Sequence, residues 1–199
     1  MNWTVITDLG DSAVMVPVAL AIAAWLSASR AWRSALVWLS LFGTGAFFVF
    51  CTQVAYAGWG VGVPQLDFTE LSGHAMGATS VLPVAGYFIG GRVSKAAALI
   101  AGSLGYGAGI LVGISRVILG DHSPSEVITG CALGGSIALA TIGVIQARLR
   151  MVAAPIIFAL TVLMLAFTLH GHKAPSHRFA VKVALYLSGR STPFVRQTQ

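Results

Sequence analysis

The chain has 199 residues, of which 56% are hydrophobic and only 9% are charged, and its mean hydropathy is +0.83. Because a soluble domain typically carries about 25% charged residues, this composition excludes an ordinary soluble protein and indicates a membrane protein. The formal net charge of +6 suits an anionic membrane surface. The basic residues form no stripe with interleaved aromatics, so we expect the lipid bilayer as a partner and no nucleic acid.

Six apolar stretches are long enough to cross a bilayer, which takes roughly 17–25 residues per helix. In chain order they are residues 12–29, 34–54, 72–90, 96–114, 127–146 and 151–169. The third is the weakest, because it begins with polar residues and contains Pro83, which kinks a helix unless neighbours satisfy the freed carbonyl. The sequence therefore predicts an all-α, polytopic membrane protein whose residues 1–170 form a six-transmembrane-helix bundle.

The connecting loops differ in charge. The first, third and fifth loops carry pairs of basic residues and are expected in the cytoplasm by the positive-inside rule. These pairs are Arg30 with Arg33, Arg92 with Lys95, and Arg148 with Arg150. The N-terminus and the second and fourth loops hold all six acidic residues and are expected on the other side. We predict a multi-pass protein of the cell membrane.

Residues 171–199 form a basic C-terminal tail, which six spans would return to the non-cytoplasmic side, against the positive-inside rule. One explanation is that residues 176–189 form a short amphipathic helix in the membrane interface, with Phe179, Val183 and Tyr186 on one side. The other is that one span, the third being the weakest, is wrong and the tail lies inside. We prefer the first, because six spans keep two polar clusters on one membrane face.

The first polar cluster, "TELSGHAM", opens the third span. A helix that begins near Ser72 points unpaired N–H groups at its surroundings, and Gly73 lets a ligand approach the backbone, which together favour an anion site. The second cluster, "SRVILGDHSPSE", adds Arg116, whose guanidinium matches phosphate oxygens. With His74 and His122 near one anion, the pattern indicates a nucleophile and an acid.

These clusters resemble motifs of the type 2 phosphatidic acid phosphatases, membrane lipid phosphatases of the acid phosphatase and vanadium haloperoxidase superfamily. The third family motif is Ser-Arg, five residues, His, three residues, Asp. "SRVILGDHSPSE" keeps this spacing, with Glu126 in place of the aspartate. The second motif, Pro-Ser-Gly-His, is similar to "LSGH", with Leu71 in place of the proline.

The resemblance implies a mechanism and a substrate class. His122 would attack phosphorus and form a phosphohistidine, Glu126 would hold its other ring nitrogen, and His74 would protonate the leaving alcohol. The phosphoryl oxygens would be bound by Arg116, Ser72, Gly73 and Ser115. No metal or other cofactor is implied. The substrate would be a phosphatidic acid-like or polyprenyl-pyrophosphate-like lipid, hydrolysed at the non-cytoplasmic face.

The first family motif, Lys, six residues, Arg-Pro, is missing. The matching segment, residues 51–68, contains no Lys or Arg, and Gln53 and Gly60 stand at the positions of the two bases. Losing two charged hydrogen bonds removes about 3–6 kcal/mol, on the order of 10²–10⁴ in rate if they tighten in the transition state. Gln53, Trp59 or a tail base such as Lys173 could compensate. The alternative is a catalytically weakened member that binds lipid head groups or acts as a scaffold.

Each assignment has a structural alternative. Residues 123–126 read as a capping box with proline at the first helical position, which alone would explain Glu126. His74 could be a packed histidine at a helix end, and Arg116 could be an interfacial anchor. Asp67 and Glu70 could orient His74 or face water. The joint spacing of the two clusters on one face favours the phosphatase.

The remaining sequence features are better explained by structural roles than by catalysis or transport. Glycines recur at four-residue spacing in the fourth and fifth spans, which predicts close helix packing in lipid. They are Gly105, Gly109 and Gly113, then Gly130 and Gly134. A histidine-rich segment, residues 170–177, could bind a metal, but it contains no acid or cysteine and reads as a turn. A transporter has the least support, because no charge marks the middle of a span.

Overall fold

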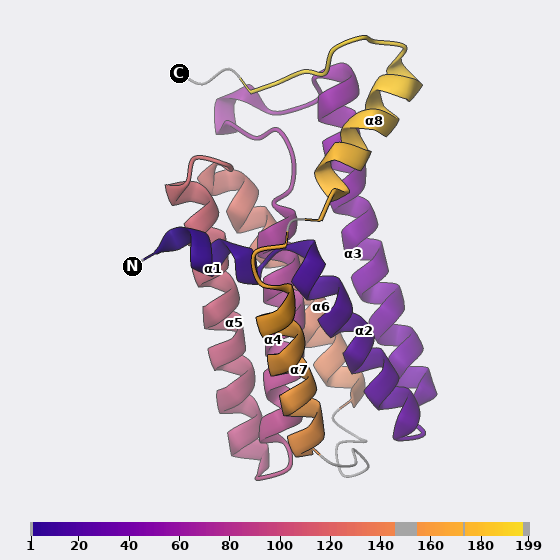
Figure 1. Ribbon diagram of the computed structural model, residues 1–199, viewed down its shortest axis with the longest axis vertical. Helices are drawn as coiled ribbons and strands as arrows, with labels where there is room; N and C mark the ends of the chain where they lie inside the picture. The colour runs from indigo at the N-terminus through magenta and orange to yellow at the C-terminus, as the bar shows by residue number, and fades with distance from the viewer. Residues whose placement is uncertain (1, 146–154, 173, 197–199) are drawn as a thin grey trace.

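The computed structural model describes residues 2–145, 155–172 and 174–196 (Figure 1). These residues form eight α-helices and one short 3₁₀ helix, so the all-α prediction is confirmed for them. In chain order the helices are α1 (Trp3–Leu9), α2 (Ser12–Ala28), α3 (Trp32–Trp59), η1 (Pro64–Leu66), α4 (Gly73–Gly90), α5 (Lys95–Ile118), α6 (Pro124–Ile145), α7 (Pro155–Leu169) and α8 (Ser176–Ser188).

Four helical segments within the described residues are long and apolar enough to cross a membrane. They are Trp3–Ala28, Trp32–Trp59, Lys95–Ile118 and Pro124–Val144. In α7 the apolar stretch Ile157–Leu169 is shorter, and α4 is not among the four. Four of the six predicted spans are therefore long and apolar enough to cross a membrane. That α4 and α7 also cross the bilayer stays a prediction.

Helix α4 lies at the centre of the bundle, between α2, α5 and α6 (Figure 1). Almost every residue from Ala75 to Gly90 is buried, although the helix contains serine, threonine and glycine. Its hydroxyls bond to the backbone of their own helix, as Thr79 Oγ1 does to the Ala75 carbonyl at 2.6 Å. Because neighbouring helices and not lipid surround α4, it does not need a strongly apolar surface.

The predicted glycine seam is where α5 and α6 meet α4. A Cβ atom on Gly105 would overlap the Leu82 carbonyl, and one on Gly109 would lie 2.9 Å from the Ala78 carbonyl carbon. On α6, a Cβ on Gly134 would overlap the Met76 carbonyl. The missing side chains let the helix backbones touch, as close packing in a membrane requires.

Helix α8 packs against the C-terminal part of α3, away from the rest of the bundle (Figure 1). Ala180 and Ala184 are buried against Val54 and Ala57 of α3. Phe179 and Tyr186 are exposed, whereas Val183, predicted on the same side, packs with the two alanines against α3. A helix thus occupies the predicted segment, while its location in the membrane interface stays a prediction.

Candidate active site

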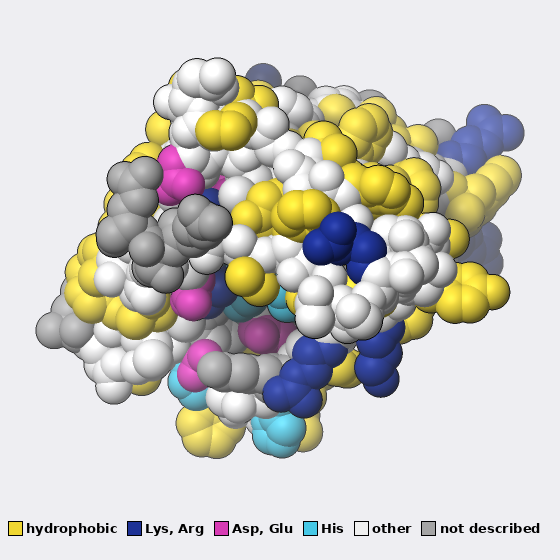
Figure 2. Space-filling model, turned by 90° about the horizontal axis from the view of Figure 1, so that it is seen from above, with side chains coloured by type: hydrophobic (Ala, Val, Ile, Leu, Met, Phe, Trp, Pro, Cys, Tyr) yellow, Lys and Arg dark blue, Asp and Glu magenta, His cyan; other side chains and the backbone are white. Residues whose placement is uncertain are grey.

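A cavity of about 450 Å³ lies at the end of the bundle where α4 begins and α5 ends. Its lining includes both histidines of the two sequence clusters, together with Gly73, Arg116 and Glu70. Figure 2 looks onto this end of the molecule and shows acidic and histidine side chains gathered around a hollow between apolar surfaces. The backbone N–H of Ser72 donates to the Glu126 carbonyl at 3.3 Å, which ties the start of α4 to the start of α6.

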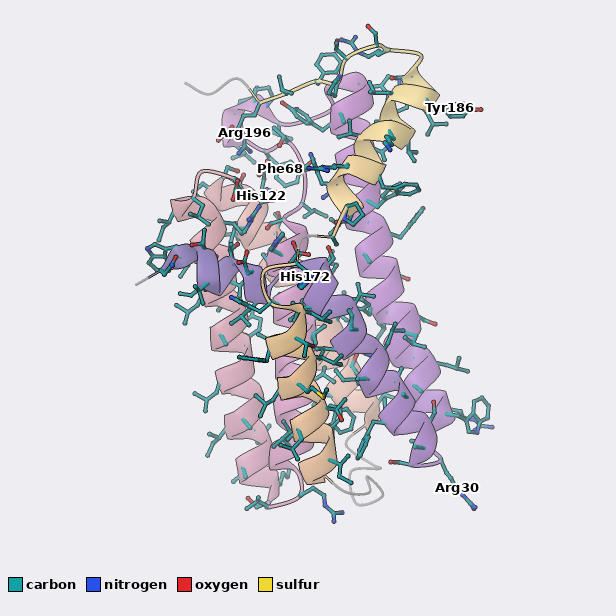
Figure 3. The ribbon with its side chains drawn as sticks, viewed as in Figure 1. Arg30, Phe68, His122, His172, Tyr186 and Arg196 are labelled. Carbon is teal, nitrogen blue, oxygen red and sulfur yellow. The ribbon has the colours of Figure 1, made fainter. Side chains whose placement is uncertain are left out.

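His122 lies in the short loop between α5 and α6 (Figure 3). Gly120 provides a positive φ of 75° in this loop, which lets the chain reverse directly after α5. A hydrogen bond of 2.7 Å joins His122 Nδ1 to Glu126 Oε2, four residues further on. Since Nδ1 is engaged and the imidazole lines the cavity, Nε2 is the ring nitrogen available to a ligand.

Glu126 is completely buried in the first turn of α6. Its Oε2 also accepts the Ser123 N–H at 3.1 Å, and the Ser123 hydroxyl accepts the Glu126 N–H at 3.4 Å. This reciprocal pair is the predicted capping box, so the same carboxylate caps the helix and holds the histidine. Its Oε1 accepts the Thr69 N–H at 2.7 Å, the Glu70 N–H at 3.2 Å and the guanidinium of Arg196.

His74 lies in the first turn of α4 and faces an acid that the sequence motifs do not include. Asp11 Oδ2 is 3.6 Å from His74 Nε2. Asp11 also caps α2 by accepting the Ala13 N–H at 2.8 Å, and it accepts the Ala174 N–H at 3.0 Å. Three contacts thus converge on the Asp11 carboxylate, and they place an acid from the N-terminal helices beside His74.

The two acids that the sequence offered as partners of His74 have other neighbours. Asp67 Oδ1 is 3.5 Å from Arg196 Nε, and Glu70 Oε1 is 3.8 Å from His177 Nδ1. Glu70 lines the cavity, and burial raises the pKa of its carboxyl above the ordinary value. Glu70 therefore contributes to the electrostatics of the cavity without bonding to His74.

Arg116 lies in the last turn of α5 and lines the cavity. Its Nη1 donates to Thr7 Oγ1 at 3.1 Å and forms an ion pair of 3.0 Å with Asp121. Its Nε is buried and has no hydrogen-bond partner in the part of the chain that the structure describes. A buried donor without a partner is costly, so this N–H is available to an anionic ligand.

Two predicted phosphate ligands do not face the cavity. Ser72 is fully buried and its hydroxyl caps α4 by accepting the Ala75 N–H at 3.5 Å. Ser115 is also fully buried and donates to the Val112 carbonyl at 2.6 Å. Both hydroxyls satisfy backbone groups of their own helix, a common outcome for serine in an apolar interior. The phosphate contacts expected from these two side chains are not offered by this arrangement, whereas Gly73 does line the cavity.

The residues offered as replacements for the missing bases differ in where they lie, and their compensating role stays a prediction. Gln53 lines the cavity, while Trp59 is 52% exposed and is not part of the lining. Lys173 lies outside the described residues. The tail does reach the site: Arg196, labelled near His122 in Figure 3, contacts the Glu126 oxygen that His122 does not use, and it does not line the cavity. Sequence reasoning missed both Arg196 and Asp11, because neither belongs to a motif.

Within the described residues, no three or more His, Cys, Asp or Glu side chains lie close enough together to hold a metal ion. This includes the histidine-rich segment, apart from residue 173. His177 instead approaches Glu70, and His172 is exposed. The site is thus built from two histidine–carboxylate pairs and one arginine around a cavity.

Comparison with known proteins identifies the family of this chain. The PAP2 superfamily profile matches residues 53–150. The chain is 32% identical over 144 residues to a protein of Bacillus subtilis (strain 168) named phosphatidylglycerophosphatase B, covering 66% of this chain and 68% of the relative. The chain belongs to the PAP2 superfamily, the family of type 2 phosphatidic acid phosphatases, and its apolar helices and family make it a multi-pass membrane protein.

A second relative extends over nearly the whole chain. An "uncharacterized 22.5 kDa protein in cps region" of Klebsiella pneumoniae is 33% identical over 202 residues, which cover 98% of this chain and 96% of the relative. No solved structure gives a significant match.

Proposed function

We propose that the protein hydrolyses a lipid phosphate or pyrophosphate through a phosphohistidine intermediate. The observation that carries this proposal is the cavity that His74, His122 and Arg116 share. A nucleophile, a general acid and a cation for the phosphoryl oxygens are the groups that such a transfer needs when no metal takes part.

The reaction has two steps. His122 Nε2 attacks phosphorus in line, and the bond between phosphorus and the leaving oxygen breaks while His74 donates its proton to that oxygen. In the second step His74 removes a proton from a water molecule, whose oxygen attacks the phosphohistidine and releases inorganic phosphate. Arg116 and the Gly73 N–H stabilise charge on the phosphoryl oxygens, and Glu126 keeps His122 Nδ1 hydrogen-bonded throughout.

A lipid substrate is supported by the inner part of the cavity. From the histidines it continues between α2 and α3, where its lining is apolar: Met15, Val16, Phe42, Ala46 and Val49. Such a surface fits hydrocarbon and offers nothing to a water-soluble phosphate ester. The name of the Bacillus subtilis relative makes phosphatidylglycerol phosphate the first lipid to test, beside phosphatidic acid and polyprenyl pyrophosphate.

The test is phosphate release by the purified protein in detergent, with a chelator present and no metal added. We expect turnover of at least one of these lipids, inhibition by vanadate, and complete loss of turnover in His122→Ala. His172→Ala is the matched control, because His172 is exposed and lies outside the cavity, and it should keep full activity. Loss of activity in the control, or turnover in His122→Ala, would contradict the assignment.

The second candidate function is lipid head-group binding with little turnover. It is favoured by one observation: among the described residues, Arg116 is the one Lys or Arg that lines the cavity. In that case His122→Ala should bind lipid phosphates as tightly as the natural protein does, and neither should release phosphate. Measured binding together with measured release separates the two functions.

We further propose that the site faces the non-cytoplasmic side, because two of the loops with paired bases lie at the opposite end of the helices: Arg30 with Arg33, and Arg92 with Lys95 (Figure 1). The test uses a variant without Cys51 and Cys131 that carries one new cysteine. Gln65→Cys, at an exposed position near the site, should react with a membrane-impermeant maleimide in intact cells. Arg92→Cys, at the other end of α4, should react only after the cells are opened. The reverse pattern would place the site inside.

A further inference from the structure

We propose that Arg196 is a positioning residue for the histidine nucleophile, and that it acts through Glu126 from the C-terminal tail. The inference rests on the proposed phosphatase function. It assigns a role to a residue that lies outside the family motifs and does not touch the cavity.

The contacts of Arg196 form a continuous chain to the nucleophile. Its Nη2 donates to Glu126 Oε1, to Thr69 Oγ1 at 3.4 Å and to the Asp67 carbonyl at 3.3 Å. Glu126 in turn holds His122 through its other carboxylate oxygen. Because Glu126 is fully buried and the Arg196 side chain is only 24% exposed, water screens this pair weakly.

Contacts of the tail with α3 fix the position of Arg196. The Phe194 N–H donates to the Ala57 carbonyl of α3 at 2.9 Å, and the guanidinium of Arg190 lies 4.2 Å from the centre of the Phe194 ring. The ring covers Gly60, where a Cβ atom would come within 3.1 Å of it. Arg196 lies two residues after Phe194 and contacts Glu126. The contacts of Phe194 with α3 therefore fix the backbone close to the position that Arg196 needs.

The charge of Arg196 has a defined effect on His122. A carboxylate beside an imidazole favours the protonated, non-nucleophilic form, and a guanidinium on the same carboxylate opposes that preference. The other ionisable groups that face His122 come from several elements. They are Arg116 on α5, Asp121 in the following loop, His74 on α4 with Asp11 beside it, Glu70 in the loop before α4, and His177 in the first turn of α8.

This arrangement explains how a chain without bases in residues 53–63 places a second cation close to its reaction centre. Arg116 lines the cavity together with His122, and Arg196 contacts the Glu126 oxygen that His122 does not use. With both in place, the Glu126 carboxylate is paired with a cation through Oε1 while its Oε2 orients His122.

The test compares pH profiles of kcat/KM for phosphate release. Arg196→Gln should move the acid limb of the profile to higher pH, by about one pH unit for the loss of a single nearby charge, while KM for the lipid changes little. Arg196→Lys, which keeps the charge, should restore most of the original profile. Arg178→Gln is the matched control, because it removes an exposed base from the same tail without touching Glu126, and its profile should not move.

A second variant covers the case in which Arg196→Gln does not fold. Phe194→Ala keeps the guanidinium but loosens the tail from α3, and it should move the acid limb in the same direction by a smaller amount. Profiles that superimpose on the natural one for both variants, or an equal shift in Arg178→Gln, would overturn the proposal while phosphate release continues. A natural protein that is inert at every pH would refute the proposed function and this inference with it.

Discussion

Asp11 and His74 form the second histidine–carboxylate pair of the cavity, with Asp11 Oδ2 3.6 Å from His74 Nε2. The first pair, His122 with Glu126, is local, because its two residues are four apart in the sequence. The second joins the N-terminal helices to α4. Each histidine therefore has its own acid, and the two acids come from different parts of the chain.

Asp11→Asn should lower kcat for a lipid phosphate about tenfold, because general acid catalysis contributes typically 10²–10⁴ and the asparagine leaves His74 in place but less well held. The loss should be smaller with an aryl phosphate, whose leaving group needs no proton. Asparagine is a good helix cap, so stability should hold, whereas Asp11→Ala should also lower the melting temperature. Equal losses with both substrates would exclude a role of Asp11 in protonating the leaving group.

Glu126→Gln should lower kcat by about 10²–10⁴, in line with the loss seen when the acid of a Ser-His-Asp triad becomes an amide. It should also destabilise the protein by about 1–3 kcal/mol, because an amide NH₂ group would face donors that now bond to the carboxylate. Glu126→Asp, which introduces the residue of the family motif, is the control and should keep measurable turnover. Phosphate release and thermal unfolding in detergent measure the two effects separately.

The local part of the site could be predicted from the sequence. The spacing in "SRVILGDHSPSE" places Arg116 at the end of one helix and Glu126 in the first turn of the next, since only a short loop separates them. Ser115 could not share the direction of Arg116, because consecutive helical residues point about 100° apart. For Asp11 and Arg196, the contacts depend on how α2 and the tail pack on the bundle, and no local pattern encodes that.

The fold was predictable to a similar degree. Composition indicates a helical membrane protein, and the glycine spacing indicates which helix faces touch. The central position of α4 could not be predicted from the sequence. Hydropathy indicates which helices contact lipid, and α4 has little contact with lipid because most of its residues are buried by other helices. The contact of α8 with α3 depends on the small side chains of Ala180 and Ala184, which resemble any other alanines in the sequence.

Glu70→Gln should make the protein more stable at neutral pH. Burial raises the pKa of the Glu70 carboxyl, and the negative charge of Glu126 adds to this, although His122 and Arg196 oppose it. An acid with a raised pKa in the folded state contributes its full stability below its unfolded pKa, about 4.3, and loses it as the pH rises through the folded value. The melting temperatures of the two proteins should therefore differ at pH 7 and converge near pH 4. A difference that persists unchanged at pH 4 would show another cause.

Gly105→Ala should destabilise the bundle by about 1–3 kcal/mol, as overpacking does in a filled interior. The added methyl would overlap the Leu82 carbonyl and lie 2.9 Å from the Pro83 nitrogen, and neither backbone group can move freely. Gly107→Ala is a control on the same helix, where a Cβ meets nothing within 4 Å, and it should be neutral or stabilising by up to about 1 kcal/mol. Similar melting temperatures for the two variants would contradict the close approach of α5 to α4.

The burial of α4 has a consequence for biogenesis. This helix carries His74 and Gly73, yet the helices that cover it on two sides, α5 and α6, are synthesised after it. Alone in a translocon, α4 would meet lipid with its serine, threonine and glycine side chains uncovered, and it should integrate poorly. Together with α5 it gains a partner for its glycine-rich face. In a glycosylation reporter, we expect α4 alone to pass through the membrane, and residues 73–118 to integrate as a helical hairpin.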